Sequence, residues 1–549
     1  MKREEIDFPP EHEALRQDVR TLGGMVGELL REQGGEPLFQ RVEAAREAAI
    51  ARRAGEPEAS LEPLCRIDDG AAAAEFVRAF AAWFRVVNLA EQVHRIRRRD
   101  DRAAAGETQP DSLEAVLAAL RDEGLEPSEL GELLERLRIE PVLTAHPTEA
   151  TRRSILEKEQ RMAGYLVERM NERLSTRAAQ RLVDRVRMEL TIAWQTAEQA
   201  EKRPTVADEA EHAHYYLANV LYRIAPVLHE NLAEAVGSVW GRDVSPARLP
   251  TLLRFGSWVG GDMDGNPNVG ADTVLDTLAE QRRQVIGNYL REVRRLNRLL
   301  SQTDGRIAIS EDLAGRLEAA RSELITAAEH IPARHRDMPY RVFLYLVEAR
   351  LQRTLDDAEH GYPSPDAFAD DLAAIAASLE QHRGRRAGLF PVQRLQRRVD
   401  IFGFHLAALD LRVDSGDLHA AVAEQLDDEK WPDRPVDERR RKLLERLAGT
   451  SSGGETRDGE HPVFRLLAAA AEARRVYGRR SVETLIVSMS RNADDVLAAW
   501  FMARQAGLED GAMDFVPLFE TVDDLQAAEG VMDGLLEEPA WRALLDQRE

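Results

Sequence analysis

The chain has almost no cysteine and no long apolar run, and each absence excludes a class of protein. Cys65 is the only cysteine, so no internal disulfide can form, which is typical of proteins from a reducing compartment. No stretch approaches the roughly 20 uninterrupted apolar residues that are needed to cross a bilayer. Residues 1–5 are mostly charged and lead into no apolar signal sequence. The sequence therefore predicts a cytoplasmic protein without a membrane anchor.

Basic residues are also fewer than acidic residues. The 549 residues include 74 lysines and arginines against 97 aspartates and glutamates, which gives a formal net charge of −23. Such a balance argues against a nucleic-acid partner, because the phosphate backbone would repel the chain. Most of this charge is expected on a solvated surface. With 44% hydrophobic residues the chain can still bury a large core, so the composition favours a soluble acidic enzyme.

Helical periodicity dominates the sequence. Apolar residues recur every three or four positions over residues 15–30 and 182–194, which predicts amphipathic helices that pack into a core. Residues 101–110 are polar and predict a loop. Residues 451–461 are too polar to bury and predict a flexible insert.

Only five short apolar runs favour strands, and long helical stretches separate them. This spacing is typical of a parallel β-barrel whose strands alternate with helices. We therefore predict a mainly α fold in which helices surround a parallel barrel, with residues 1–549 forming one intertwined unit. The predicted strands are residues 141–145, 253–259, 405–411, 485–489 and 515–519.

Residues 142–153 bring together several side chains that can carry chemistry. A short apolar run leads to His146 and Pro147, and Arg152 and Arg153 then open a helix. Proline restricts the preceding histidine to an extended backbone. An imidazole beside paired guanidinium groups suits an anionic, oxygen-rich substrate. The alternative is a buried histidine at a strand–helix junction.

Two further motifs follow short apolar runs. Residues 255–268 hold four glycines with Asp262 and Asp264, and glycine allows close approach of the backbone to a ligand. The alternative is a tight loop with capping aspartates. Residues 515–525 end an apolar strand in Glu520, whose carboxylate suits Mg²⁺. Helix capping explains that glutamate equally well.

In this order, the three motifs resemble phosphoenolpyruvate carboxylase of the bacterial and plant type. The resemblance runs along most of the chain, and the motifs around His146 and Gly260 are its most specific parts. It is also carried by residues 15–23, 31–35, 94–99, 194–196, 409–415 and 488–490.

The resemblance implies a lyase that joins phosphoenolpyruvate and bicarbonate to give oxaloacetate and phosphate, a reaction that replenishes the tricarboxylic acid cycle. Bicarbonate attacks phosphorus to give carboxyphosphate and an enolate, and the enolate then captures CO₂. Two catalytic residues are implied: His146 holds carboxyphosphate and accepts its proton, and Arg412 neutralises phosphate charge. Glu520 would be a ligand of Mg²⁺ or Mn²⁺, which stabilises the enolate oxygen and the phosphoryl group.

The resemblance also implies substrate-binding residues, namely Arg152, Arg153 and Leu518. The two arginines correspond to residues that bind sugar-phosphate activators in some members of the family. Ordinary salt bridges at a helix N-terminus are an equally good explanation for them.

Family members continue past the equivalent of Glu549 and are usually homotetramers with an eight-stranded barrel. Two expected features occur nowhere in this sequence: a strand with the pattern Gly-Tyr-Ser-Asp-Ser-x-Lys-Asp, and a loop rich in arginine and glycine. We therefore expect an N-terminal part of the enzyme with an incomplete, TIM-like barrel of about five of the eight strands. A second metal ligand and a lysine belong to the missing strand, so this chain by itself is expected to be inactive.

Three departures from the family pattern leave other functions open. Met263 and Ala200 stand where arginines are expected, and Tyr222 stands where many members have a tryptophan near the methylene pocket of the substrate. One alternative is a non-catalytic paralogue that serves as a scaffold or regulatory subunit. Another is a metal-dependent hydrolase on a similar barrel.

Overall fold

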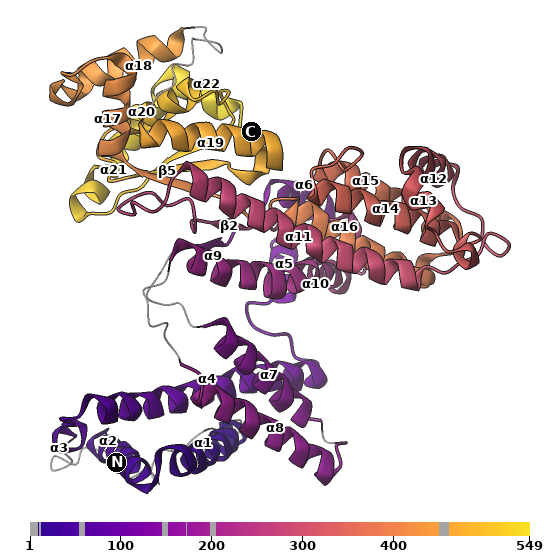
Figure 1. Cartoon of the computed structure of the whole chain (residues 1–549), viewed down its shortest axis with the longest axis vertical. Helices are drawn as coiled ribbons and strands as arrows, with labels where there is room; N and C mark the ends of the chain where they lie inside the picture. Colours follow the sequence, from indigo (N-terminus) through magenta and orange to yellow (C-terminus); the bar gives the residue numbers. More distant parts are fainter. Residues whose placement is uncertain are drawn as a thin grey trace. The chain divides into compact units, whose positions relative to one another are not determined.

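The computed structural model describes residues 9, 12–53, 61–144, 152–171, 173–197, 205–449 and 461–548 (Figure 1). His146 and most of the predicted insert 451–461 lie outside these residues. The chain divides into two compact units. The first comprises Met1–Val116 and Thr151–Arg203, and the second comprises Leu117–Ala150 and Pro204–Glu549. The single intertwined unit stays a prediction, and each unit is described by itself.

The first unit is entirely helical in its described part. The predicted amphipathic helix over residues 15–30 is confirmed within α1, whose Leu22, Val26 and Leu30 are buried against α4. The predicted helix over 182–194 is confirmed within α8, which packs along α7. The helices are α1 (Glu13–Gly34), α2 (Glu36–Arg53), α3 (Glu62–Cys65), α4 (Gly70–Ala105), α7 (Arg153–Arg169) and α8 (Thr176–Trp194).

The loop predicted over residues 101–110 begins too early, because α4 continues to Ala105. The last residues of this helix, 103–105, are alanines, which have the highest helix propensity of all residues. The helix ends at Gly106, whose φ of 70° is left-handed and whose N–H bonds back to Arg102 and Ala103. The helix propensity of the alanines and the cap at Gly106 therefore determine where α4 ends, and the polarity of residues 101–110 does not.

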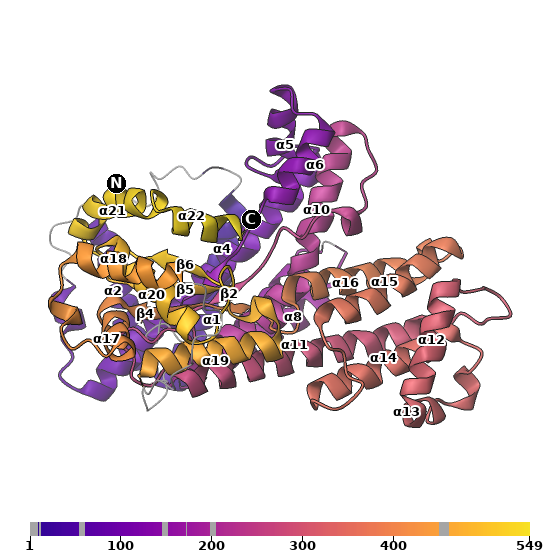
Figure 2. The same ribbon diagram turned by 90° about the horizontal axis from the view of Figure 1, so that it is seen from above.

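The described part of the second unit has two large buried cores and two smaller ones. One large core lies among the long helices α11, α14, α15 and α16, and Figure 2 shows α11 and α14 running side by side. The other large core surrounds the strands and is formed largely by α17, α19 and α20. The helices are α5 (Leu113–Asp122, which begins in the first unit), α6 (Pro127–Arg136), α9 (Val206–Tyr215), α10 (Tyr222–Trp240), α11 (Ala271–Leu299), α12 (Glu311–Glu323), α13 (Ile325–Glu329), α14 (Pro339–Leu355), α15 (Pro365–Gln381), α16 (Phe390–Phe402), α17 (Ser415–Leu426), α18 (Val436–Ala448), α19 (Pro462–Tyr477), α20 (Ala493–Gln505), α21 (Val522–Leu536) and α22 (Pro539–Asp546).

Strands occur at all five predicted places, and all of them pair in parallel. They form two three-stranded sheets, β1-β2-β3 and β4-β5-β6, in which neighbours in the sheet are neighbours in the chain order. The bounds are β1 (Val142–Leu143), β2 (Gly256–Ser257), β3 (Ala408–Leu409), β4 (Leu411–Asp414), β5 (Thr484–Ser488) and β6 (Asp514–Pro517).

The third predicted strand, residues 405–411, differs from the observed one. Leu406 has a left-handed φ of 63°, so the chain still turns there and β3 begins only at Ala408. Asp410 then separates β3, which pairs with β2, from β4, which pairs with β5. As a result, Arg412 lies inside β4 and not directly after the end of a strand.

The described structure is mainly helical with two small parallel sheets, which confirms the predicted fold class at that level. No closed barrel is formed by the residues that the structure describes. Among the described helices, none is both long and apolar enough to cross a membrane.

Candidate active site

Arg412 is the centre of the candidate site, and backbone pairing brings the glycine-rich loop to it. The Arg412 N–H donates to the carbonyl of Gly261, and the Met263 N–H donates to the carbonyl of Arg412, each at 3.0 Å. A Cβ atom on Gly261 would lie 2.2 Å from the carbonyl oxygen of Asp410, so only glycine permits this approach. The loop therefore runs beside β4 and carries Asp262 and Asp264 to the Arg412 side chain.

Three carboxylates surround the Arg412 guanidinium. Its Nη2 donates to Asp264 Oδ2 and to Glu520 Oε1, each at 2.6 Å, and its Nη1 donates to Asp262 Oδ2 at 3.4 Å. The guanidinium carbon also lies 5.6 Å from the ring centroid of Trp258, within the range of a cation–π contact. One guanidinium charge thus faces three acidic groups, which leaves an excess of negative charge that favours an additional cation.

The site is partly shielded from solvent. The side chains of Arg412 and Asp262 are each 17% exposed, that of Asp264 is 22% exposed and that of Glu520 is 29% exposed. Burial raises the pKa of Asp262, while the charge of Arg412 and a hydrogen bond from the Asp264 backbone oppose this shift. The ion pairs are therefore stronger than typical surface pairs, and Glu520 is the most accessible of the three acids.

Glu520 lies in the short connection between β6 and α21. Two backbone hydrogen bonds hold the chain just before Glu520 in place. The Leu518 N–H donates to the carbonyl of Val487 at 2.9 Å, and the Ser490 N–H donates to the carbonyl of Leu518 at 3.3 Å. Thr521 then begins α21 in a capping box with Asp524. The substrate-binding role predicted for Leu518 stays a prediction, and its backbone helps to place Glu520.

The oxygen chemistry of this site fits a hard divalent cation. Mg²⁺ and Mn²⁺ prefer carboxylate oxygens, and Mg²⁺ is commonly held by one or two carboxylates together with water and substrate oxygens. Glu520 is a partly exposed carboxylate in a cluster with excess negative charge. It can therefore serve as one ligand of such an ion, as the sequence predicts.

The remaining predicted residues belong to the first unit or lie outside the described part. His146 is not described, so its role stays a prediction. Arg152 and Arg153 belong to the first unit, where Arg152 precedes the first residue of α7 and Arg153 donates to Glu157 at 2.9 Å. That pair is an i,i+4 salt bridge of the kind expected at a helix N-terminus, and the substrate-binding role of the two arginines stays a prediction.

Two of the three departures can be placed. Met263 packs against the apolar core around the strands, so the loop gains an apolar anchor where an arginine was expected. Tyr222 is buried, and its ring contacts Phe402 and the guanidinium of Arg398. The structure therefore places Tyr222 in the helical core, and the expected methylene pocket near it, which the smaller ring would leave looser, stays a prediction. Ala200 lies outside the described residues.

The partner of two acids was not predicted from the sequence. Asp262 and Asp264 were interpreted as either ligand-loop or capping residues, whereas both pair with Arg412 about 150 positions later in the chain. The close spacing of four glycines and two acids was the available signal. This spacing indicated that the loop backbone approaches another group closely, but it did not identify that group as the β4 backbone at Asp410 and Arg412.

A second acidic cluster, His419, Asp494 and Asp495, lies in the second unit and could in principle hold a metal. The indole N–H of Trp431 donates to His419 Nδ1 at 3.1 Å, so the neutral ring carries its proton on Nε2 and donates to Asp495 at 2.9 Å. Asp494 accepts from Arg439 at 2.7 Å. The histidine lone pair is therefore already used, whereas Asp494 Oδ1 is buried and has no hydrogen-bond partner among the described residues. We assign no ion to this cluster.

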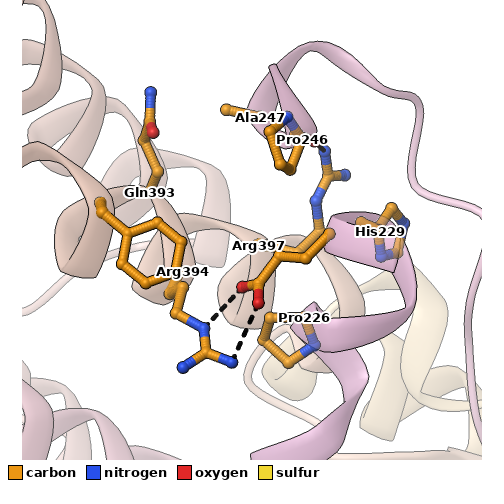
Figure 3. A pocket seen from close by; sticks show the side chains of 9 residues that line it. Pro226, His229, Pro246, Ala247, Gln393, Arg394 and Arg397 are labelled. Atoms are coloured by element: carbon orange, nitrogen blue, oxygen red, sulfur yellow. Dashed lines mark hydrogen bonds and ion pairs between the residues drawn. The ribbon is translucent and has the colours of Figure 1, made fainter. Parts of the chain in front are cut away.

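A pocket between α10, the turn Pro246–Arg248 and α16 is a further candidate (Figure 3). Arg394 donates to both carboxylate oxygens of Glu230, at 2.6 and 3.3 Å. Arg397 donates to Thr251 and to backbone carbonyls. Burial lowers the pKa of His229 to about 4, so its ring is neutral at pH 7. Glu230 and Arg394 neutralise each other, and Arg397 also faces Asp400 at 3.8 Å outside the pocket lining. We assign no reaction to this pocket.

Comparison with known proteins agrees with the resemblance seen in the motifs. A family model described as phosphoenolpyruvate carboxylase matches residues 15–549. A phosphoenolpyruvate carboxylase from Xanthomonas campestris pv. campestris (strain ATCC 33913) is 44% identical over the whole of this chain and 61% of the relative. One from Azorhizobium caulinodans is 32% identical with the same coverage. One from Xanthomonas oryzae pv. oryzae is 44% identical over 97% of this chain and 60% of the relative. The chain thus spans about three fifths of the length of these relatives.

Proposed function

Because the chain belongs to the phosphoenolpyruvate carboxylase family, we propose that the Arg412–Glu520 site is part of an active site that carboxylates phosphoenolpyruvate with bicarbonate. The products are oxaloacetate and phosphate, and the reaction is anaplerotic. One observation carries this proposal. A guanidinium and a carboxylate that are 108 positions apart in the chain meet at 2.6 Å beside two parallel strands.

Each side chain in the site has a proposed task. Arg412 neutralises charge on the phosphate group, because its planar fork matches two phosphate oxygens. Glu520 holds Mg²⁺ or Mn²⁺, which supplies positive charge for the enolate oxygen and the phosphoryl group. His146 accepts a proton, and Arg152, Arg153 and Leu518 contact the substrates. These last four assignments rest on the resemblance.

The proposal extends to the barrel. The strands β1 to β6 are parallel and follow the chain order, and β3 and β4 are separated by Asp410 alone. This arrangement supports an incomplete, TIM-like barrel of five strand regions in which one strand is interrupted. A homotetramer and a cytoplasmic location are implied by the family and are part of the same proposal.

Oxaloacetate formation tests the proposed activity. The 549 residues are assayed alone and as a chimaera in which the remaining two fifths of the Xanthomonas campestris relative follow them. We expect turnover from the chimaera and none from the 549 residues, because these lack the pattern that carries the implied lysine and second metal ligand. In the chimaera, Arg412→Gln should lower kcat by about 10²- to 10³-fold.

Arg394→Gln is the matched control, since Arg394 also pairs with a glutamate but lies in the pocket of Figure 3. It should leave kcat unchanged. Phosphate release without bicarbonate would instead favour the hydrolase. A folded chimaera with no turnover would favour the scaffold or regulatory paralogue. Full activity of Arg412→Gln would contradict the proposed role of the site.

A further inference from the structure

We propose that the Arg412–Glu520 ion pair is a latch: Glu520 occupies an N–H donor of Arg412 that a phosphate group needs, and releases it when it binds a divalent cation. Asp262 and Asp264 remain on the guanidinium and keep it in place. This inference rests on the proposed function, and it adds to that function an internal contact that opposes both ligands.

Most N–H donors of Arg412 on the side that would face a phosphate group are already used, which supports the latch. An arginine has five N–H donors, two on each terminal nitrogen and one on Nε. Both donors of Nη2 are used, one by Asp264 and one by Glu520, and Nη1 gives one donor to Asp262. Nε is buried and has no partner among the described residues. A bidentate contact to phosphate through Nη1 and Nη2 therefore requires that one carboxylate leave Nη2.

The surroundings of the two acids on Nη2 indicate which one leaves. Asp264 belongs to the loop that pairs with the Arg412 backbone on both sides, and its own N–H donates to Asp262 Oδ1 at 3.2 Å. Glu520 comes from a different strand connection, after β6. It is also the most exposed of the three acids, at 29% against 22% and 17%. Glu520 is therefore the acid that can leave Arg412 with the least change in the backbone and the smallest loss of buried surface.

Electrostatic repulsion links cation binding by Glu520 to the release of an Arg412 N–H donor. While Glu520 pairs with Arg412 through Oε1, a cation that approaches the carboxylate also comes close to the guanidinium, and the two positive charges repel each other. When the carboxylate turns to the cation, the repulsion falls and one donor of Nη2 becomes available. A divalent cation and an oxyanion thus share one ion pair, and each favours the state in which that pair is open.

Binding of Mn²⁺ and of inorganic phosphate to the 549-residue chain tests the latch without any turnover. Titration of Mn²⁺ followed by electron paramagnetic resonance should show that Arg412→Gln tightens Mn²⁺ binding about fivefold to tenfold. Arg491→Gln is the control, because Arg491 is a nearby exposed arginine that faces Asp524 and not Glu520. It should change Mn²⁺ affinity by less than about twofold.

Phosphate binding by calorimetry in the absence of metal is the second measurement. Glu520→Gln should tighten phosphate binding at least about threefold, because it frees Nη2 and removes a negative charge. Asp523→Asn removes the same charge three residues away from Glu520, outside the contacts of Arg412, and controls for the general field. Equal effects of these two variants would contradict the latch.

The outcomes for Mn²⁺ separate the latch from the proposed function. Loss of Mn²⁺ binding in Glu520→Gln together with tighter binding in Arg412→Gln supports both. Loss in Glu520→Gln with no change in Arg412→Gln overturns the latch and leaves Glu520 as a metal ligand. Unchanged Mn²⁺ binding in Glu520→Gln overturns both. No Mn²⁺ binding in either the wild type or Arg412→Gln overturns the latch, whereas the proposed function is tested by the chimaera.

Discussion

Asp410 is a buried carboxyl group near Arg412 in the chain, and its environment is unfavourable for a charge. Burial raises its pKa to about 6, and the charge of Glu140 adds to this shift. Hydrogen bonds from Thr484 and Trp258 and the charge of Arg138 act in the opposite direction. The position between β3 and β4 thus places a group that titrates near pH 6 two residues from Arg412.

The raised pKa of Asp410 predicts a pH-dependent contribution to stability. An aspartate in the unfolded chain has a pKa of about 3.9, so below pH 4 both states carry the proton. As the pH rises toward 6, the unfolded chain loses the proton while the folded chain keeps it, which favours unfolding. The group therefore contributes stability at low pH that is lost as the pH passes through about 6, on the order of 2 to 3 kcal/mol.

Urea denaturation at several pH values between about 4.5 and 7.5 measures this contribution. The free energy of unfolding of the wild type, minus that of Asp410→Asn, should fall as the pH rises and become constant above about pH 6.5. Taking the difference removes the contribution of the other acidic groups. A difference that is the same at every pH would show that burial of Asp410 does not shift its pKa.

At the residue scale, the sequence was sufficient to single out residues but not their partners. Arg412 and Glu520 were assigned to one site before any geometry was known, and the structure brings them together. Asp262 and Asp264 were not assigned to Arg412, because their contact depends on backbone pairing between a loop and a strand far apart in the chain. Such pairing leaves no local pattern in the sequence.

At the scale of elements, the position of Glu520 depends on how α21 begins. Thr521 accepts a hydrogen bond from the Asp524 N–H at 3.1 Å, and Asp524 accepts one from the Thr521 N–H at 3.2 Å. This capping box fixes the residue directly after Glu520. The same box occurs at α9, where Thr205 and Asp208 cap each other.

Thr521→Ala should therefore affect both stability and metal binding. Loss of the cap should lower the free energy of unfolding by about 1 kcal/mol, and Thr205→Ala should have a similar effect. Only Thr521→Ala should weaken Mn²⁺ binding, by about threefold to tenfold, because only this cap orients Glu520. Equal Mn²⁺ affinities of the two variants would show that the α21 cap does not position the carboxylate.

The strands show where prediction of elements from sequence reaches its limit. Apolar runs located all five strand regions, because buried parallel strands are nearly continuous in hydrophobic residues. The break at Asp410 and the left-handed Leu406 were missed, since both follow from the pairing of one region with two different neighbours. The number of strands in a sheet and its closure are likewise properties of the whole fold.

At the scale of the whole molecule, the second unit exposes an apolar face near its last strand. Val522 and Leu525 at the start of α21 are 70% and 61% exposed, and Val516 on β6 is also exposed. Within the described sheet, β6 pairs only with β5, so its other edge has no strand partner there. A free strand edge beside exposed apolar side chains is a typical site of self-association.

This face predicts that the chain self-associates and that the associated fraction rises with protein concentration. Sedimentation velocity over a range of concentrations should show larger species for the wild type and a clear reduction for the double variant Val522→Ser/Leu525→Ser. Ile325→Ser is the matched control, because Ile325 is equally exposed, at 61%, but lies on α13. Removal of one isolated apolar side chain should not change association, since scattered exposed residues are normal on soluble proteins. If the control reduces association as much as the double variant does, general surface hydrophobicity and not the β6–α21 face drives it.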